Sequence, residues 1–124
     1  MPRLCFALDL NDDPALIAEY ERWHQPDQVW PEVVESISSA GIRELEIFRV
    51  DDRLFMVMEV AEDFSLAAKA AADATNPRVQ AWEALMWRFQ KPLPRAESGA
   101  KWAAMKRIFS LTQARDAMVS KQAP

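Results

Sequence analysis

The chain has 124 residues, of which half are hydrophobic and 27% are charged, and its formal net charge is −4. This balance is typical of one folded domain with a real core, and it argues against disordered and fibrous classes of protein. The 15 basic residues are scattered along an acidic chain rather than gathered in a stripe, so the sequence does not predict a nucleic-acid partner.

Export, membrane insertion and metal binding are not expected either. The first apolar run, residues 4–10, is short and contains Asp9, unlike a signal peptide or a membrane span. Cys5 is the only cysteine and the chain has one histidine, so neither an internal disulfide nor a zinc-type cluster is predicted. Only two glycines are present, which excludes P-loop and dinucleotide motifs. We therefore expect a cytoplasmic protein without a cofactor or a membrane partner.

The first elements in chain order are a strand and a helix. Residues 3–10 carry a large apolar side chain at every second position, which predicts a strand with one apolar face. The sequence Asp-Asp-Pro that follows predicts a helix over about residues 14–24, with an aspartate as N-cap and Pro14 at the first helical position. Pro26 should stop this helix.

A second helix and a hairpin come next. "WPE" at residues 30–32 indicates a helix start, and Gly41 is placed to end that helix. The runs 43–50 and 53–60 resemble strands, and the Asp51-Asp52 pair between them predicts a two-residue hairpin turn.

The remaining chain predicts two helices and a last strand. Alanine-rich residues 64–74 favour a helix, and Asn76-Pro77 should begin another that ends before Pro92. After a polar loop around Ser98-Gly99, "MKRIFSL" (residues 105–111) predicts the last strand. We expect one domain over residues 1–112 and a polar, frayed tail over 113–124.

Four strands with helices between them predict a ferredoxin-like α+β fold, in which a four-stranded antiparallel sheet is covered by helices on one face. The other sheet face would then be bare, although it carries apolar side chains. We expect a second subunit to bury it, which predicts a homodimer.

Tyr20 and His24 are the first candidates for catalysis. They are four residues apart on the first predicted helix, so their side chains share a face. His24 lies in the last turn, where the helix dipole favours the imidazolium form, and its ordinary pKa makes it a proton carrier near neutrality. Alternatively, both are helix-end residues that contact backbone carbonyls and solvent.

Tryptophans and carboxylates supply further candidates. Trp82 and Trp30 are candidate platforms for the C–H face of a sugar, although core packing explains such residues equally well. Trp23 is expected to point elsewhere on its helix. Glu59 interrupts an otherwise apolar strand, and a carboxylate in that position needs a partner. Glu46 is the other carboxylate that we expect to bind substrate.

The order of these segments resembles the L-rhamnose mutarotases, a family of small dimeric α+β barrel proteins. The resemblance covers about residues 3–111 and rests on "FALDL", "EYERWH", "WPE", the hairpin "IFRVDDRLFMVMEV", "PRVQAW" and a closing "IFSL". It implies an enzyme that interconverts the anomers of a 6-deoxy-L-sugar without a metal or redox cofactor.

Residue roles follow from this resemblance. The family's catalytic histidine matches His24, and the tyrosine one turn earlier matches Tyr20. The first residue of a ligand-contacting tryptophan pair matches Trp82, whereas the second position is Glu83. A family tyrosine on the second strand falls at Leu45, beside Glu46. The loop after the histidine is also two residues longer, so the preferred sugar is open between L-fucose and L-rhamnose, and these changes favour L-fucose.

Two other functions remain open at the level of the sequence. The same architecture is used by cofactor-free monooxygenases that act on hydrophobic phenols and quinols, and fold alone does not decide function. A sugar-binding module without catalysis would use the same aromatic and hydroxyl contacts.

Overall fold

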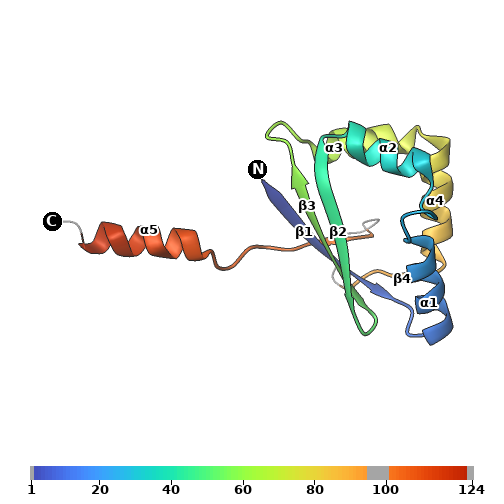
Figure 1. Cartoon of the computed structure of the whole chain (residues 1–124), viewed down its shortest axis with the longest axis horizontal. Helices are drawn as coiled ribbons and strands as arrows, with labels where there is room; N and C mark the ends of the chain where they lie inside the picture. Colours follow the sequence, from blue (N-terminus) through green and yellow to red (C-terminus); the bar gives the residue numbers. More distant parts are fainter. Residues whose placement is uncertain (1, 95–100, 123–124) are drawn as a thin grey trace.

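The computed structural model describes residues 2–94 and 101–122. In chain order the elements are β1 (Arg3–Leu10), α1 (Pro14–Trp23), α2 (Pro31–Ser39), β2 (Ile42–Val50), β3 (Arg53–Val60), α3 (Leu66–Ala74), α4 (Pro77–Trp87), β4 (Gln90–Lys91), β5 (Ala103–Ala104) and α5 (Leu111–Gln122). Helices α1 to α4 lie on one side of the sheet, and α5 projects away on the other side (Figure 1).

The sheet is antiparallel and has the order β2-β3-β1-β4, with β5 also paired to β1. β1 pairs with β3 from Arg3 opposite Glu59 to Asp9 opposite Arg53. The two-residue strands β4 and β5 pair with different parts of β1 and together occupy the fourth position of the sheet. The predicted ferredoxin-like α+β fold, with helices over one sheet face, is confirmed.

Helices α1 and α4 begin where predicted, and each is capped by the side chain of the residue before it. The carboxylate of Asp13 accepts hydrogen bonds from the backbone N–H groups of the first turn of α1, and Pro14 follows it. The Asn76 side chain accepts two such bonds at the start of α4. These contacts satisfy N–H groups that have no partner inside a helix. Local sequence therefore places both helices.

The hairpin and the end of α2 also agree with prediction. Asp51 turns the chain with a positive φ of 52°, a conformation that aspartate adopts more readily than most residues. Gly41, with φ of 89°, follows α2 and lets the chain enter β2.

The C-terminal part of the chain differs from prediction. Strand pairing occurs earlier than expected, at β5, and a last sheet bond runs from the Met105 N–H to the Cys5 carbonyl at 2.8 Å. Residues 105–110 have no regular structure, and α5 replaces the expected frayed tail. The expected strand over 105–111 is therefore wrong, because its residues leave the sheet and Ile108 is 92% exposed. The predicted loop around Ser98-Gly99 lies outside the described residues.

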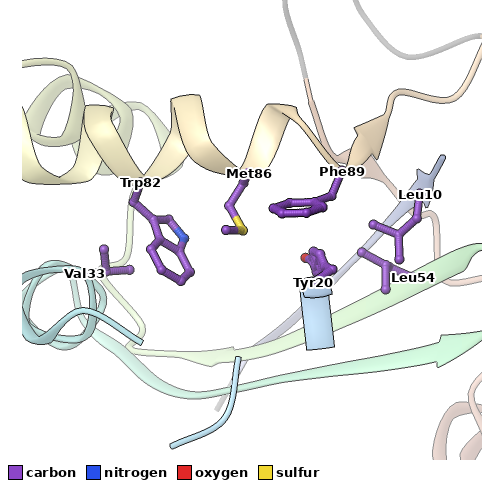
Figure 2. Packing of buried hydrophobic residues seen from close by; sticks show 7 residues of the cluster. All are labelled: Leu10, Tyr20, Val33, Leu54, Trp82, Met86 and Phe89. Atoms are coloured by element: carbon purple, nitrogen blue, oxygen red, sulfur yellow. The ribbon is translucent and has the colours of Figure 1, made fainter. Parts of the chain in front are cut away.

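The core lies between the sheet and the helix layer. Seven buried side chains from β1, β3, three helices and the turn after α4 form its main cluster (Figure 2): Leu10, Tyr20, Val33, Leu54, Trp82, Met86 and Phe89. A second cluster under α2 joins Phe6, Ile42, Met58 and Val60. Burial of such side chains supplies the main free energy of folding. Within the described residues no helix is long and apolar enough to cross a membrane.

Candidate active site

A cavity of about 540 Å³ lies between the helix layer and the sheet. This volume is in the range of pockets that bind small molecules. Most of its wall is apolar, from residues such as Phe6, Val33, Leu45, Met58 and Trp82. Its polar wall residues are Tyr20, His24, Ser36, Lys69, Asp73, Glu83 and Gln90. An apolar space with a few polar groups can orient a ligand that has both kinds of surface.

The structure brings Tyr20 and His24 together in this cavity. Their rings stack with centroids 4.2 Å apart and planes 18° apart. Nδ1 of His24 lies 2.7 Å from the backbone oxygen of Tyr20. Because a carbonyl oxygen only accepts hydrogen bonds, Nδ1 carries the proton in this contact. In the neutral ring Nε2 is then the acceptor, so this nitrogen is the one that can take a proton.

Burial keeps both rings neutral near pH 7. It lowers the pKa of the His24 imidazole below 6.5, and the hydrogen bond to the Tyr20 carbonyl opposes this shift only in part. The imidazolium form that the helix end was expected to favour is therefore opposed by burial of the ring. Burial also raises the pKa of the Tyr20 phenol to about 12. The site thus pairs a neutral base with a neutral acid.

Gln90 is a polar wall residue that the sequence did not indicate. Its side-chain Nε2 lies 3.5 Å from the Tyr20 hydroxyl, and the residue is only 7% exposed. Among the described residues its Oε1 atom has no hydrogen-bond partner. A buried amide of this kind fixes the phenol and keeps one polar end for another group. Gln90 lies in the two-residue strand β4, and only the pairing of β4 with Leu10 brings it under Tyr20.

Trp82 forms an apolar wall beside His24, with ring centroids 5.7 Å apart. Trp30 and Trp23 pack against Trp82 with their edges, at 5.3 and 6.2 Å between centroids. Both therefore support Trp82 from outside the cavity. Among the described residues of the cavity wall, Trp30 does not occur, so the geometry gives it a packing role.

Glu46 and Glu59 lie on the other face of the sheet. Leu45 lines the cavity, and because successive strand residues point to opposite faces, Glu46 points away from it. Glu59 also lies outside the cavity, where its carboxylate forms an ion pair with Arg3 at 3.8 Å. Neither carboxylate is in the described cavity wall. The geometry therefore gives no support for substrate binding by these two residues.

Glu83, by contrast, lies in the wall of the cavity. Its carboxylate pairs with the ammonium of Lys101, which also lies 4.8 Å from the centre of the Trp87 ring. Trp102, the residue after Lys101, lines the cavity too. Lys101 and Trp102, which precede β5, therefore both lie at the site.

The sheet order, the helix layer and the cavity between them define a ferredoxin-like α+β protein of the dimeric α/β-barrel class. Two solved structures share this fold. An L-rhamnose mutarotase from Formosa agariphila matches 90% of this chain and 99% of its own, with a TM-score of 0.65 and 24% identity. Tetracenomycin F2 cyclase from Streptomyces glaucescens matches 89% and 96%, with a TM-score of 0.58 and 17% identity.

Sequence comparison is more specific than fold. Residues 3–111 match the L-rhamnose mutarotase family. An L-fucose mutarotase from Xanthomonas campestris pv. campestris is 65% identical over 114 residues, which are 92% of this chain and 91% of that protein. The chain belongs to the L-rhamnose mutarotase family, and it is a mutarotase, an enzyme of the isomerase class.

Proposed function

We propose that this mutarotase interconverts the α and β anomers of a 6-deoxy-L-hexose, and that it prefers L-fucose to L-rhamnose. The observation that carries the proposal is the stacked pair of a neutral His24 and a neutral Tyr20 beside Trp82. The 65% identity to a protein named L-fucose mutarotase supports the choice of sugar. So does the presence of Leu45 and Glu83 at ligand-contacting positions of the family.

Mutarotation requires two proton transfers, and the site has a group for each. Nε2 of His24 takes the proton of the anomeric hydroxyl, and the Tyr20 phenol gives its proton to the ring oxygen as the bond between C1 and that oxygen breaks. The products are an open-chain aldehyde, an imidazolium and a phenolate. After rotation about the C1–C2 bond the hydroxyl attacks the other face of the aldehyde, and both protons return.

The pKa shifts set the starting protonation states that these roles need. A lowered pKa leaves His24 unprotonated at pH 7, and a raised pKa keeps Tyr20 protonated. The same burial makes His24 a weaker base and Tyr20 a weaker acid. The two groups need not change charge before substrate binds. The apolar wall formed by Trp82 matches the C–H face of the sugar ring.

Exchange between α and β anomer signals, measured by saturation-transfer NMR, tests the proposal. We expect the enzyme to accelerate exchange of L-fucose and, less strongly, of L-rhamnose over the spontaneous rate in the same buffer. Absence of acceleration for both sugars would overturn it. Oxygen uptake with quinols serves as a negative control for the monooxygenase alternative, which no contact in the described site favours.

A homodimer is the second part of the proposal. On the sheet face opposite the helices, Phe48 is 52% and Val50 is 68% exposed. On the same side of the sheet the C-terminal segment projects away from the rest of the chain (Figure 1), with Ile108 92% and Phe109 67% exposed. A second copy would bury both surfaces. Light scattering should give twice the chain mass of 14.2 kDa, and a monomer at micromolar concentration would contradict this.

We also propose a cytoplasmic location. Cys5, the single cysteine of the chain, is unpaired, and free thiols are usual in reducing compartments. Fractionation of cells that express the tagged full chain tests it, and recovery of the protein outside the cytosolic fraction would contradict it.

A further inference from the structure

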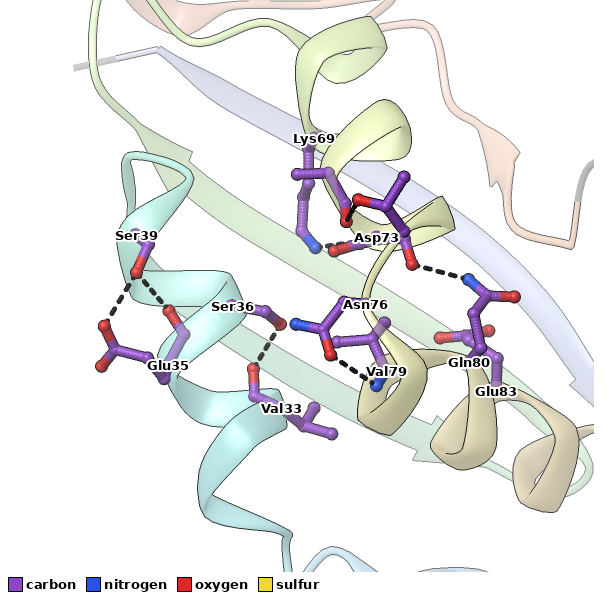
Figure 3. A network of polar contacts seen from close by, with 12 residues as sticks. Val33, Glu35, Ser36, Ser39, Lys69, Asp73, Asn76, Val79, Gln80 and Glu83 are labelled. Atoms are coloured by element: carbon purple, nitrogen blue, oxygen red, sulfur yellow. Dashed lines mark hydrogen bonds and ion pairs between the residues drawn. The ribbon is translucent and has the colours of Figure 1, made fainter.

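An ion pair that the sequence did not single out lies in the cavity wall. Nζ of Lys69 donates to a carboxylate oxygen of Asp73 at 2.6 Å, and both residues come from α3 (Figure 3). The two side chains are only 18% and 24% exposed. An ammonium has three N–H donors and a carboxylate has several lone pairs, so the pair has capacity for a ligand as well.

Helix stability does not explain this pair. In an i, i+4 pair the acidic residue stabilises more when it comes first, whereas here Lys69 comes first. The helix dipole also favours acidic residues near the N-terminus and basic residues near the C-terminus. Asp73 lies in the last turn of α3, which ends at Ala74, so its position opposes the dipole. An exchange of the two residues would suit the helix better.

The pair lies at the α2–α3 end of the cavity. Ser36 of α2 lines the cavity there and donates a hydrogen bond to the Val33 carbonyl at 2.7 Å (Figure 3). In Figure 2 Val33 lies at one end of the row of core residues, and Trp82 and Met86 lie between it and Tyr20. Ser36, Lys69 and Asp73 also line an outer groove between α2 and α3. The cavity therefore has a second polar end, away from Tyr20, that adjoins this groove.

The geometry of a pyranose relates the two ends. The ring bond between C1 and the ring oxygen, where the reaction occurs, is opposite the bond between C3 and C4. A sugar that presents its reacting bond to His24 and Tyr20, with its C–H face on Trp82, directs its 3- and 4-hydroxyls to the α2–α3 end.

We infer that Lys69 and Asp73 bind the 3- and 4-hydroxyls of the sugar and so determine specificity at C4. This inference rests on the proposed function. Asp73 accepts a hydrogen bond from the 4-hydroxyl, and Lys69 donates one to the 3-hydroxyl. L-fucose and L-rhamnose have opposite configurations at C4 as well as at C2, so an acceptor fixed at C4 distinguishes them. Charged partners make the stronger kind of hydrogen bond.

Two variants separate ligand binding from helix stability. Asp73→Asn keeps the shape and removes the charge, and the exchange Lys69→Asp/Asp73→Lys keeps an ion pair and the net charge. We expect each variant to lower kcat/KM for L-fucose by about 10-fold, mainly by raising KM. This is the effect expected from the loss of one hydrogen bond to a charged group. The exchanged variant should melt at or above the wild-type temperature. Wild-type kcat/KM in the exchanged variant would overturn the inference.

Deoxy sugars locate the contact. For the wild type, kcat/KM should be about 10-fold lower with 4-deoxy-L-fucose than with L-fucose. For Asp73→Asn, kcat/KM should be the same with the two sugars. With 2-deoxy-L-fucose, the ratio of kcat/KM between wild type and Asp73→Asn should equal the ratio measured with L-fucose. Equal additional losses for the 4-deoxy sugar in wild type and Asp73→Asn would overturn the assignment.

Glu35→Gln is the matched control. Glu35 lies on α2 and lines the outer groove but, in the described wall, not the cavity. It should leave kcat/KM within about 2-fold of wild type, since distant charges are screened. Binding of L-fucose can be measured separately from catalysis by the change in tryptophan fluorescence. This measurement distinguishes failure of the inference from failure of the proposed function. A wild type that binds without accelerating exchange refutes the function alone, whereas a wild type that does not bind refutes both.

Discussion

The two faces of the sheet have different surroundings. One face packs against helices α1 to α4 and encloses the cavity, with Leu45 and Met58 in its wall. The opposite face carries cross-strand ion pairs and leaves Phe48 half exposed. Both faces carry apolar side chains, but the strand carboxylates such as Asp9, Glu46 and Glu59 lie on the open face. The helix layer makes one face a site and leaves the other available for a partner.

This comparison also explains why neighbours in the sequence differ in role. Leu45 and Glu46 are adjacent, yet one lines the cavity and the other faces away from it. The two-residue period of a strand separates them. A change on the enclosed face should therefore alter catalysis, and a change on the open face should alter association.

The largest effect is expected on the enclosed face. His24→Ala removes the base and should lower kcat for anomer exchange by about 10²–10⁴-fold, the usual contribution of general acid–base catalysis. Saturation-transfer NMR on L-fucose measures it, with circular dichroism to show that the variant folds. Full exchange in this variant would refute the assignment.

On the open face, Phe48→Glu should disrupt association. Burial of an unpaired carboxylate in an interface costs several kcal/mol, so the dimer should weaken by about 10²-fold or more. Sedimentation velocity at micromolar concentration measures the change. Val34→Glu is the matched control, because Val34 is equally exposed, at 50%, but lies on α2. Dissociation by Val34→Glu rather than Phe48→Glu would place the interface on the helices.

Tyr20→Phe tests the second member of the catalytic pair. Removal of the phenol proton should slow anomer exchange, although less than in His24→Ala, where the principal base is lost. Loss of the hydroxyl also leaves the buried Gln90 amide without its contact, so the free energy of unfolding should fall by about 1 kcal/mol. Urea unfolding measures this fall. A slower rate than that of His24→Ala would make Tyr20 the principal group.

The pH dependence should be one-sided. Because burial lowers the pKa of His24, kcat/KM should fall on the acid side with a midpoint below 6.5, where the imidazole becomes protonated. The pKa of Tyr20, raised to about 12, predicts no alkaline loss up to about pH 10. Exchange rates, after subtraction of the spontaneous rate in each buffer, test the acid and the alkaline side of the pH profile. An acid midpoint at or above 6.5 would contradict a buried neutral imidazole.

Linkage predicts a matching change in stability. The unfolded chain binds a proton at His24 near pH 6.5, before the folded chain does. The free energy of unfolding should therefore decrease as the pH falls through this range. His24→Gln should reduce that decrease, which urea unfolding at several pH values can measure. An unchanged slope would show that other groups dominate.

The smallest effect is expected for Glu46→Gln. Glu46 is exposed and faces away from the cavity, so kcat/KM should stay within about 2-fold of wild type. The same NMR measurement tests it. A loss comparable to that of Asp73→Asn would show that the open face contributes to the site.

Features with a local cause could be predicted from the sequence. Asp13 and Asn76 begin their helices with their own side chains, and Asp51 turns the hairpin. The spacing of Tyr20 and His24 placed both rings on one face of α1. The segment 105–111 lacked such a cause, since an apolar run becomes a strand only when a sheet edge receives it. β4 and β5 already occupy that edge of β1.

The sequence by itself determined the order of most helices and strands, the family, and the placement of Tyr20 beside His24, because caps, turns and helical spacing act over a few residues. Only the tertiary structure placed Gln90 under Tyr20, lowered the pKa of His24 and put Lys69 and Asp73 in the cavity wall. It also turned Glu46 and Glu59 away from that cavity. Burial and contact between distant segments exist only after the helices have packed on the sheet.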